Sequence, residues 1–235
     1  MATADRNALA PHVAMQIAIL AEHGAAVSPS TRVLDFGCGD GALVAAWQEL
    51  GLNIRGCDLS VPAGAPSLSV IGEPYRLPYD DDEFDVVVSD QVFEHVMDYG
   101  VAFRELRRVT RPGGVGLHIF PARWRPVEAH VFVPFAGRFT SAWWLRLWAS
   151  LGVRNRFQKE QDAAAVARIN QDWLRTSTNY LTTAMIERAA QPHFRTAWAE
   201  DAMLRHAYGR ARVLRRVPFR ARLLHHLHMR VLITL

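Results

Sequence analysis

The stretch VLDFGCGDGAL, residues 33–43, constrains the fold of this chain more than any other segment. An apolar run ends in Asp35, glycines follow at positions 37, 39 and 41, and a helical pattern begins directly after them. A short buried strand that enters a glycine turn and then a helix exposes backbone N–H groups at a helix N-terminus, where a polar ligand can bind. We therefore predict a strand–turn–helix unit with a ligand above the turn.

Strands and helices alternate along the first half of the chain. Strand patterns cover residues 31–37, 53–60, 83–90 and 115–121, and helical patterns cover residues 7–24, 40–51 and 101–114. The continuous valine run in residues 83–90 suits a parallel strand that is covered on both faces. The Pro-Gly-Gly at 112–114 is expected to stop the helix before it. This alternation predicts an α/β doubly wound sheet.

The pattern changes after Pro121, and six of the seven tryptophans lie beyond this residue. Helices are predicted over residues 141–152, 160–176 and 176–190, and strands over residues 193–199 and 227–235. Residues 122–175 therefore look like an insertion on the sheet. The aromatic side chains there are typical of core or lid packing.

Length and composition indicate one sizeable core, because half of the 235 residues are apolar. No uncharged apolar run approaches about 18 residues, so no membrane-spanning segment is expected, and no secretory signal is evident. Cys38 and Cys57 fall in two turns of the ligand site, which predicts free thiols and a cytoplasmic location. A net charge of +4 does not indicate nucleic-acid binding, although residues 201–230 carry eight arginines against Asp201 alone.

Two acids define the ligand. Asp35 precedes the glycine turn, where it would repel a pyrophosphate but suit a cationic group. Asp58 ends the next strand, 19 residues after Gly39, and a carboxylate there can accept hydrogen bonds from both hydroxyls of a ribose. The spacing G-x-G-x-G also differs from the G-x-G-x-x-G of dinucleotide sites, which argues against a nicotinamide oxidoreductase. The predicted ligand is an adenosine that carries a positively charged amino-acid tail.

With these features, the chain resembles the class I S-adenosylmethionine-dependent methyltransferases of the type 11-like kind. The resemblance rests on four blocks in the family's order: VLDFGCGDGAL, GCDLS, GEPYRLPYDDDEFDVVVSDQVFEHV and FRELRRVTRPGGVGLHIFP. It implies a seven-stranded Rossmann-like sheet whose last strand is antiparallel, with a helical insertion after the fifth strand. It also implies S-adenosylmethionine as cofactor. A methyltransferase-like module that only binds a partner is disfavoured by the retained acids and glycines.

The resemblance divides the single domain, residues 1–235, into four parts. These are an N-terminal helix in 1–26, a cofactor-binding half in 27–121, a helical lid and acceptor region in 122–190, and C-terminal strands with a basic helix in 191–235. Carried over position by position, it implies that nine residues contact the cofactor: Asp35, Gly37, Gly39, Asp58, Leu59, Glu73, Tyr75, Ser89 and Gln91.

Candidate catalytic residues follow two strands at the edge where ligands bind in such sheets. Glu94 and His95 come just after residues 83–90, and His130 follows residues 115–121 in PARWRPVEAHVFVPF. An imidazole titrates near neutral pH and can take the proton of an acceptor hydroxyl. The same segment supplies Arg123, Trp124 and Glu128 as candidate substrate contacts. His118 lies in mid-strand and is interpreted as a core histidine.

The acceptor and the role of a metal stay open. The PARWRPVEAHVFVPF segment is similar to one in bacterial methyltransferases of polysaccharide biosynthesis, which favours O-methylation of a sugar or oligosaccharide hydroxyl. A small aromatic, quinone-like or lipid acceptor is the alternative. Glu94, His95 and His130 form a candidate site for a divalent ion such as Mg²⁺, although Mg²⁺ prefers oxygen ligands. The acidic run at 80–83 is interpreted as a solvated loop, and homo-oligomerisation is left open.

Overall fold

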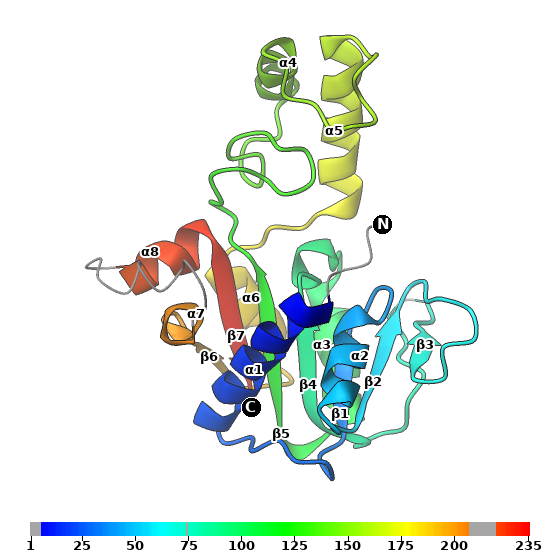
Figure 1. Ribbon diagram of the computed structural model, residues 1–235. Coiled ribbons are helices and arrows are strands. Elements are labelled where there is room, and N and C mark those ends of the chain that lie inside the picture. The colour runs from blue at the N-terminus through cyan, green and yellow to red at the C-terminus, as the bar shows by residue number, and fades with distance from the viewer. Residues whose placement is uncertain (1–5, 74, 207–219) are drawn as a thin grey trace.

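The computed structural model describes residues 6–73, 75–206 and 220–235. Within these residues seven strands form one mixed sheet in the order β3-β2-β1-β4-β5-β7-β6 (Figure 1). The strands are β1 (Val33–Phe36), β2 (Ile54–Asp58), β3 (Leu68–Val70), β4 (Phe84–Asp90), β5 (Thr110–Pro121), β6 (Thr196–Trp198) and β7 (Met229–Thr234). Strands β1 to β5 pair in parallel, and β7 runs antiparallel to both β5 and β6. The predicted doubly wound sheet with an antiparallel last strand is confirmed.

Helices cover both faces of this sheet, with α1 and α2 in front and α3 and α6 behind in Figure 1. The helices are α1 (Arg6–Glu22), α2 (Ala42–Glu49), the 3-10 turn η1 (Phe93–His95), α3 (Tyr99–Val109), α4 (Ala142–Ser150), α5 (Ala163–Ser177), α6 (Thr183–Ala190), α7 (Ala202–Arg205) and α8 (Arg220–Leu227). None of the helices in the described residues is long and apolar enough to cross a membrane.

The two faces of the sheet explain why its strands are apolar throughout. Successive side chains of a strand point to opposite faces, so Val33 joins the apolar cluster under α1 and α2 while Leu34 joins the cluster under α3 and α6. Val86 and Val87 divide in the same way. All four residues of β1 are buried, including the carboxylate residue Asp35. Covering both faces leaves the ends of the strands as the exposed part of the sheet.

The boundary between α3 and β5 differs from the prediction. The helix was expected to continue to the glycines at 113–114, but α3 ends at Val109 and β5 begins at Thr110. Pro112 disfavours helical backbone at the residue before it. Thr110 is already extended, and its hydroxyl donates to the Leu106 carbonyl at 2.6 Å, which satisfies a carbonyl at the helix end. The Pro-Gly-Gly therefore lies inside the strand.

Two further predictions need correction. The helix expected over residues 176–190 begins only at Thr183, because the Thr182 hydroxyl accepts from Met185 N and acts as its N-cap. Strand β3 and helix α7 carried no clear periodic signal, since they span three and four residues respectively. The arginine-rich stretch falls partly on α8, and its residues 207–219 lie outside the described residues, as do residues 1–5.

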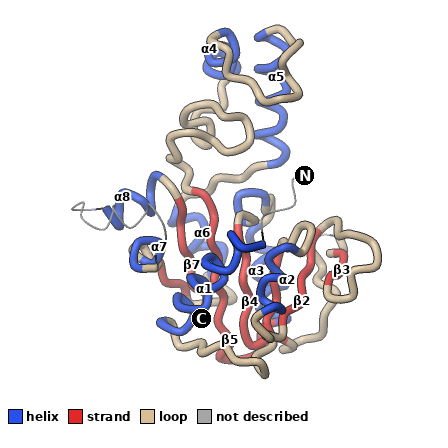
Figure 2. The backbone as a smooth tube through the Cα atoms, viewed as in Figure 1, coloured by secondary structure: helices blue, strands red, loops and turns tan. Residues whose placement is uncertain are grey.

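Helices α4 and α5 stand beyond the sheet at the top of Figure 1 and pack against each other. Their contact is a small separate core that includes Leu145, Ala167 and Leu174. Two loop segments connect this pair to the sheet, as the tube in Figure 2 shows. The predicted lid region ended at residue 190, but α6 lies back on the sheet, where Ile186 joins the same cluster as Phe103 of α3. The segment off the sheet is therefore residues 122–182.

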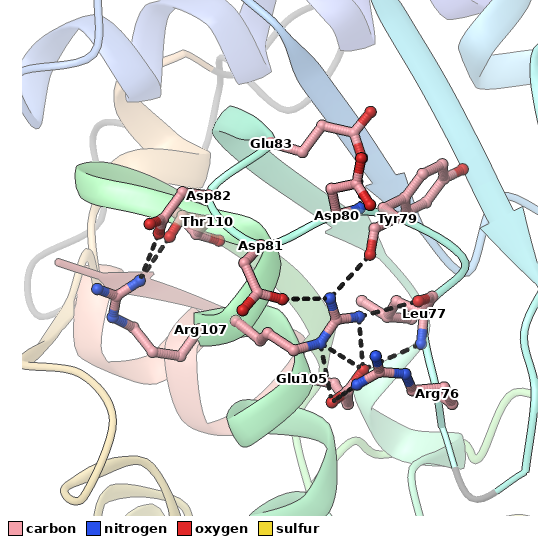
Figure 3. A network of polar contacts seen from close by, with 11 residues as sticks. Arg76, Leu77, Tyr79, Asp80, Asp81, Asp82, Glu83, Glu105, Arg107 and Thr110 are labelled. Carbon is pink, nitrogen blue, oxygen red and sulfur yellow. Dashed lines mark hydrogen bonds and ion pairs between the residues drawn. The ribbon is translucent and has the colours of Figure 1, made fainter.

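The acidic run at 80–83 is held by arginines (Figure 3). Arg108 of α3 donates to Asp81 at 2.9 Å, to Glu105 at 2.8 Å and to the carbonyls of Leu77 and Tyr79. Asp82 pairs with Arg107 and Glu83 with Arg55 in the same way, whereas Asp80 is held through its backbone N–H, which donates to Glu83. These contacts fasten the loop before β4 to α3, and we assign them a structural role.

Candidate functional site

A cavity of about 450 Å³ opens at the carboxyl ends of β1, β2 and β4. The strand order reverses between β1 and β4, and this is the point of such sheets where ligands bind. Its lining residues end or follow β1, β2, β3 and β4 or come from the segment off the sheet: Phe36, Gly37, Asp58, Leu59, Ile71, Tyr75, Gln91, Val92, His95, Val96, His130 and Trp173. A volume of about 300–1,000 Å³ is usual for a small-molecule site.

The glycine turn forms one wall of this cavity. Gly37 has a φ of +83°, and a Cβ there would lie 2.3 Å from Cγ2 of Val92, so only glycine fits. Gly39 has a φ of +55°, but nothing lies within 4 Å of a Cβ built on it. The first glycine is therefore needed for packing. The second leaves its backbone open, as a site for a close-lying ligand requires.

Asp58 closes the turn. Its Oδ2 accepts from the Gly39 N–H at 2.8 Å, and its Oδ1 accepts from the Leu59 N–H at 2.7 Å. These bonds hold the carboxylate at the cavity, and each oxygen keeps a free lone pair for a ligand hydroxyl. Leu59 beside it is 63% exposed, which suits a side chain that packs on a ligand ring.

Asp35 lies in β1 next to Phe36 and Gly37 of the cavity lining but is not itself part of that lining. It is 2% exposed, and its Oδ2 has no hydrogen-bond partner among the described residues. Burial raises the pKa of this carboxyl to about 8, and the nearby Asp90 and Asp58 add to the effect. Such a group is stabilised when a cationic ligand arrives. The arrangement fits a cofactor that carries an ammonium group, as the sequence indicated.

His130 and Glu128 form a hydrogen-bonded pair in the loop after β5. Oε1 of Glu128 accepts from Nδ1 of His130 and from the Tyr180 hydroxyl, both at 2.7 Å. Burial raises the pKa of Glu128, but the hydrogen bonds from His130, Tyr180 and the Val131 N–H outweigh it and lower this pKa to about 2. The Glu128 hydrogen bond raises the pKa of His130. Because Nδ1 is occupied, the other ring nitrogen of His130 is the one available to a ligand.

His95 stands next to His130, with the ring centroids 4.8 Å apart and the rings nearly perpendicular. Its Nδ1 donates to the Ser177 carbonyl at 2.6 Å, and burial lowers its pKa, so the imidazole is neutral near pH 7. Glu94 is not among the residues that line the cavity and is 1% exposed. Burial raises the pKa of Glu94 to about 7.

The donor set expected for a metal does not assemble. Among the described residues there is no group of three or more His, Cys, Asp or Glu side chains arranged to hold an ion. Nδ1 of His95 and Nδ1 of His130 are both committed to protein oxygens. Glu94, the only oxygen donor of the predicted trio, is a carboxyl whose pKa is raised to about 7. Glu94, His95 and His130 therefore do not form a metal-binding group in the described residues, and the Glu94–His95–His130 site stays an untested prediction.

Of four further residues predicted to contact the cofactor, two line the cavity and two do not. Tyr75 and Gln91 line the cavity, and the Tyr75 hydroxyl accepts from Met97 N at 2.8 Å. Glu73 is exposed and is not part of the lining. Ser89 is also absent from it, since its buried hydroxyl lies 2.9 Å from Nδ1 of His118. That bond confirms His118 as a satisfied core histidine.

Arg123 and Trp124, expected to contact the substrate, lie in a different hollow near α6 and α8. Cys38 and Cys57 are both free thiols, as expected.

Two side chains at or near the site, Tyr180 and His12, were missed by sequence reasoning, and a third, Trp173, was expected only as one of the lid tryptophans of residues 122–175. Trp173 of α5 lines the cavity and lies 6.0 Å from the His130 ring. Tyr180 fell inside a predicted helix, and nothing marked its contact with Glu128. His12 of α1 hydrogen-bonds to Asp90 at the end of β4. These contacts span 43 to 78 residues, so no local motif could have revealed them.

Comparisons with known proteins agree with this geometry. Residues 34–117 match a family model described as a methyltransferase domain. A demethylmenaquinone methyltransferase of Roseiflexus castenholzii is 37% identical over 95 residues, which is 35% of this chain and 40% of that protein. A malonyl-acyl-carrier-protein O-methyltransferase of Erwinia billingiae is 32% identical over 124 residues, which is 44% of this chain and 49% of that protein. The match thus spans less than half the length of these curated relatives.

One solved structure matches along almost the whole chain. It is an S-adenosylmethionine-dependent methyltransferase from Mesorhizobium loti, with a TM-score of 0.54 and 17% identity. The alignment covers 94% of this chain and 97% of that structure. This likeness shows a shared fold, including the part of the chain beyond residue 117.

Proposed function

We propose that the chain is a class I S-adenosylmethionine-dependent methyltransferase and that it methylates a hydroxyl oxygen with His130 as the base, which the matched methyltransferase domain and the shared fold support. The observation that carries this proposal is the Glu128–His130 pair beside the glycine-turn cavity. An imidazole oriented by a buried carboxylate is a common arrangement for removing a proton from a hydroxyl.

The chain's own residues divide the work as follows. Asp58 and the backbone at Gly39 would hold the ribose side of the cofactor, and Asp35 would pair with its ammonium group. When bound, S-adenosylmethionine would supply a methyl group on a positively charged sulfur. The free nitrogen of His130 would take the O–H proton of the acceptor. Glu128 stabilises the resulting imidazolium.

His95 has a different part in this proposal. Its lowered pKa makes it a poorer base than His130. Because Nδ1 donates to the Ser177 carbonyl, its other nitrogen accepts hydrogen bonds. We assign it a positioning role, in which its ring packs against the His130 ring and holds that base at the cavity.

The acceptor we favour is a phenolic or quinol-like ring. The cavity walls are mainly apolar and aromatic, with Phe36, Ile71, Val92 and Trp173 among them. The curated relative that acts on demethylmenaquinone supports a ring of this kind. A sugar hydroxyl is the second candidate, since Trp173 is 44% exposed beside His130 and offers a flat face on which a sugar ring can pack.

We further propose that residues 122–182 act as a lid over the acceptor. Asn179, near the end of this segment, attaches it to the loop after β4. Its backbone N–H donates to the Glu94 carbonyl at 2.6 Å, and its side-chain amide donates to the carbonyls of Val96 and Met97. Trp173 of α5 then covers part of the cavity.

The test is transfer of a labelled methyl group to panels of phenols, quinols and sugars. His130→Ala should lower turnover of the accepted compound by about 10²- to 10⁴-fold and leave the cofactor Kd unchanged. His193→Ala is the matched control, because this histidine is not part of the cavity lining. Full turnover in His130→Ala would reject His130 as the base, and labelling of a nitrogen or carbon would reject the hydroxyl acceptor.

A further inference from the structure

A second, smaller cavity of about 180 Å³ lies between the end of β5, the start of α6, helix α8 and the start of β7. Arg123, Arg230, His225 and His226 contribute basic side chains to it, and none of its lining residues is acidic. We call it the Arg123–Arg230 cavity. Because β7 is antiparallel to β5, the start of β7 and the end of β5 meet at the same edge of the sheet as the glycine turn.

Arg230 is built into this cavity. It is 5% exposed, and its guanidinium donates to the Leu181 carbonyl at 3.1 Å and to the Thr183 hydroxyl at 2.7 Å. It also lies 4.3 Å from the centroid of the Trp198 ring. Burial lowers its pKa to about 10, so it keeps its charge near pH 7.

Glu187 is the acidic residue whose charge affects the pKa of Arg230, and it does so through space, without a hydrogen bond to the guanidinium. The Glu187 carboxylate accepts from Trp198 Nε1 at 2.8 Å and is not among the ion-pair partners recorded for the described residues. Arg230 therefore places a fixed positive charge at the cavity that no carboxylate of the described residues neutralises directly.

Two buried polar atoms of this cavity lack a partner among the described residues: Nε of Arg123 and Nδ1 of His225. Buried polar groups are nearly always hydrogen-bonded, so each exception calls for an explanation. His225 is 2% exposed, and burial together with Arg230 and His226 lowers its pKa to about 4. Its neutral ring can still donate one hydrogen bond.

The N-terminus of α6 faces the same cavity through Thr182 and Thr183. The Thr182 hydroxyl satisfies Met185 N, and no acidic residue lies in the first turn of this helix. The remaining N–H groups of that turn and the helix dipole favour an anion.

We propose that the Arg123–Arg230 cavity binds a phosphate group. Two guanidinium groups, a helix N-terminus and an unpartnered imidazole provide donors from several directions, as the oxygens of a phosphate require. The volume admits a phosphate group with a short ester substituent but no large ligand. This inference does not depend on the acceptor that receives the methyl group.

The first test is titration of inorganic phosphate into the protein, followed by calorimetry and by the ³¹P resonance. Arg123→Ala should weaken phosphate binding about ten-fold or more, as expected for loss of a charged hydrogen-bond donor, and Arg123→Lys should recover part of it. Arg188→Ala is the matched control, because Arg188 is an exposed residue of α6 that lines a different hollow. Equal phosphate affinity in the unmodified protein and Arg123→Ala would overturn the proposal, and so would no binding to the unmodified protein at millimolar phosphate.

A second variant and a second readout keep the test independent of folding and of methyl transfer. Arg230→Met should also lose phosphate binding, and if it does not fold, Arg123→Ala and Arg123→Lys decide. Cofactor affinity, measured in parallel, should stay unchanged in all Arg123 variants, so loss of phosphate binding is distinguishable from failure of the methyltransferase site. Turnover of matched acceptors with and without a phosphate then identifies the source. A KM raised by Arg123→Ala only for the phosphorylated acceptor places the phosphate on the acceptor, and an unchanged KM assigns the cavity to free phosphate or a lipid headgroup.

Discussion

Oε1 of Glu128 lies 2.7 Å from Nδ1 of His130, and both oxygens of this carboxylate are engaged, since Oε2 accepts from the backbone N–H groups of His130 and Val131. The carboxylate is 2% exposed. A buried acid held by this many donors is fixed in position and ionised, and it fixes the ring orientation of His130.

Glu128→Gln should therefore change the pH dependence of turnover. Glu128 raises the pKa of His130, and the base must be neutral, so activity rises with pH through that pKa. Without the charge, the pKa of His130 falls, and the rising limb of kcat/KM should move to lower pH. The maximum should drop about ten-fold or more as the imidazolium loses its partner.

Tyr180→Phe is the control for this profile, because it removes one hydrogen bond to Glu128 and keeps the charge. Tyr180→Phe should shift the rising limb of the kcat/KM profile much less than Glu128→Gln does. A limb that stays in place in Glu128→Gln would show that another group is the base.

Asp35→Asn should stabilise the protein without cofactor at pH 8. The folded pKa of about 8 is raised from 3.8, so the contribution of Asp35 to stability is present below about pH 4 and is lost as the pH rises through 8. Asparagine cannot ionise, so the variant avoids this loss. Its free energy of unfolding at pH 8 should exceed that of the unmodified protein by roughly 1–4 kcal/mol. Urea unfolding at pH 4.5 and pH 8 measures it.

The same Asp35 variant should bind S-adenosylmethionine more weakly, because the carboxylate is expected to pair with the cofactor's ammonium group. A variant that is less stable at pH 8 than the unmodified protein would mean that the buried carboxylate has a stabilising partner.

Asp58→Ala should weaken cofactor binding by about 1–3 kcal/mol, the cost of leaving polar groups unpaired. Asp58 also holds the Gly39 and Leu59 N–H groups, so the loss combines a ligand contact with a looser turn. Asp58→Asn keeps an acceptor for one of these groups and should lose less. Calorimetry that finds unchanged affinity in Asp58→Ala would remove this residue from the site.

Gly37→Ala and Gly39→Ala form a matched pair. Both residues have positive φ, which costs an L-residue about 1–2 kcal/mol, but only the alanine at 37 overlaps Val92. Gly37→Ala should lose a further 1–3 kcal/mol or so of unfolding free energy through overpacking. Adding Val92→Ala should recover part of this second loss, and equal destabilisation of the two single variants would contradict the packing argument.

Trp173→Ala tests the lid. The acceptor KM should rise several-fold while the cofactor Kd is unchanged, because Trp173 lines the cavity from α5. Trp143→Ala is the control, since that side chain is 67% exposed on α4 and is not part of the lining. A larger change, deletion of residues 140–160, should abolish acceptor turnover because it removes α4, on which α5 packs. Full activity after this deletion would reject the lid.

The strands of the sheet and the glycine turn with Asp58 can be predicted from local sequence. Continuous apolar runs, glycines at fixed spacing and an acid at the end of β2 are local patterns, and each local pattern reports on a few adjacent residues. The strands β1, β2, β4, β5, β6 and β7, the helix after the glycine turn and the position of Asp58 all follow from them. The helix end near Thr110 was misplaced because a Pro-Gly-Gly stop does not say whether the strand begins before or after it.

The contacts around His130 depend on residues far apart in the sequence, which come together only in the folded chain. The rings of His95 and His130 are in contact although these residues follow different strands. Trp173, which contacts His130, is 43 residues further along the chain, and Tyr180, which donates to Glu128, is 52 residues further along. The same folding separated Arg123 from His130 and placed it with Arg230, 107 residues later in the chain and in a different cavity. Sequence spacing cannot express such contacts, because the packing of helices and loops on the sheet edge sets them. Only the folded chain therefore shows which histidine is paired with a carboxylate, which histidine is neutral and which acids are buried.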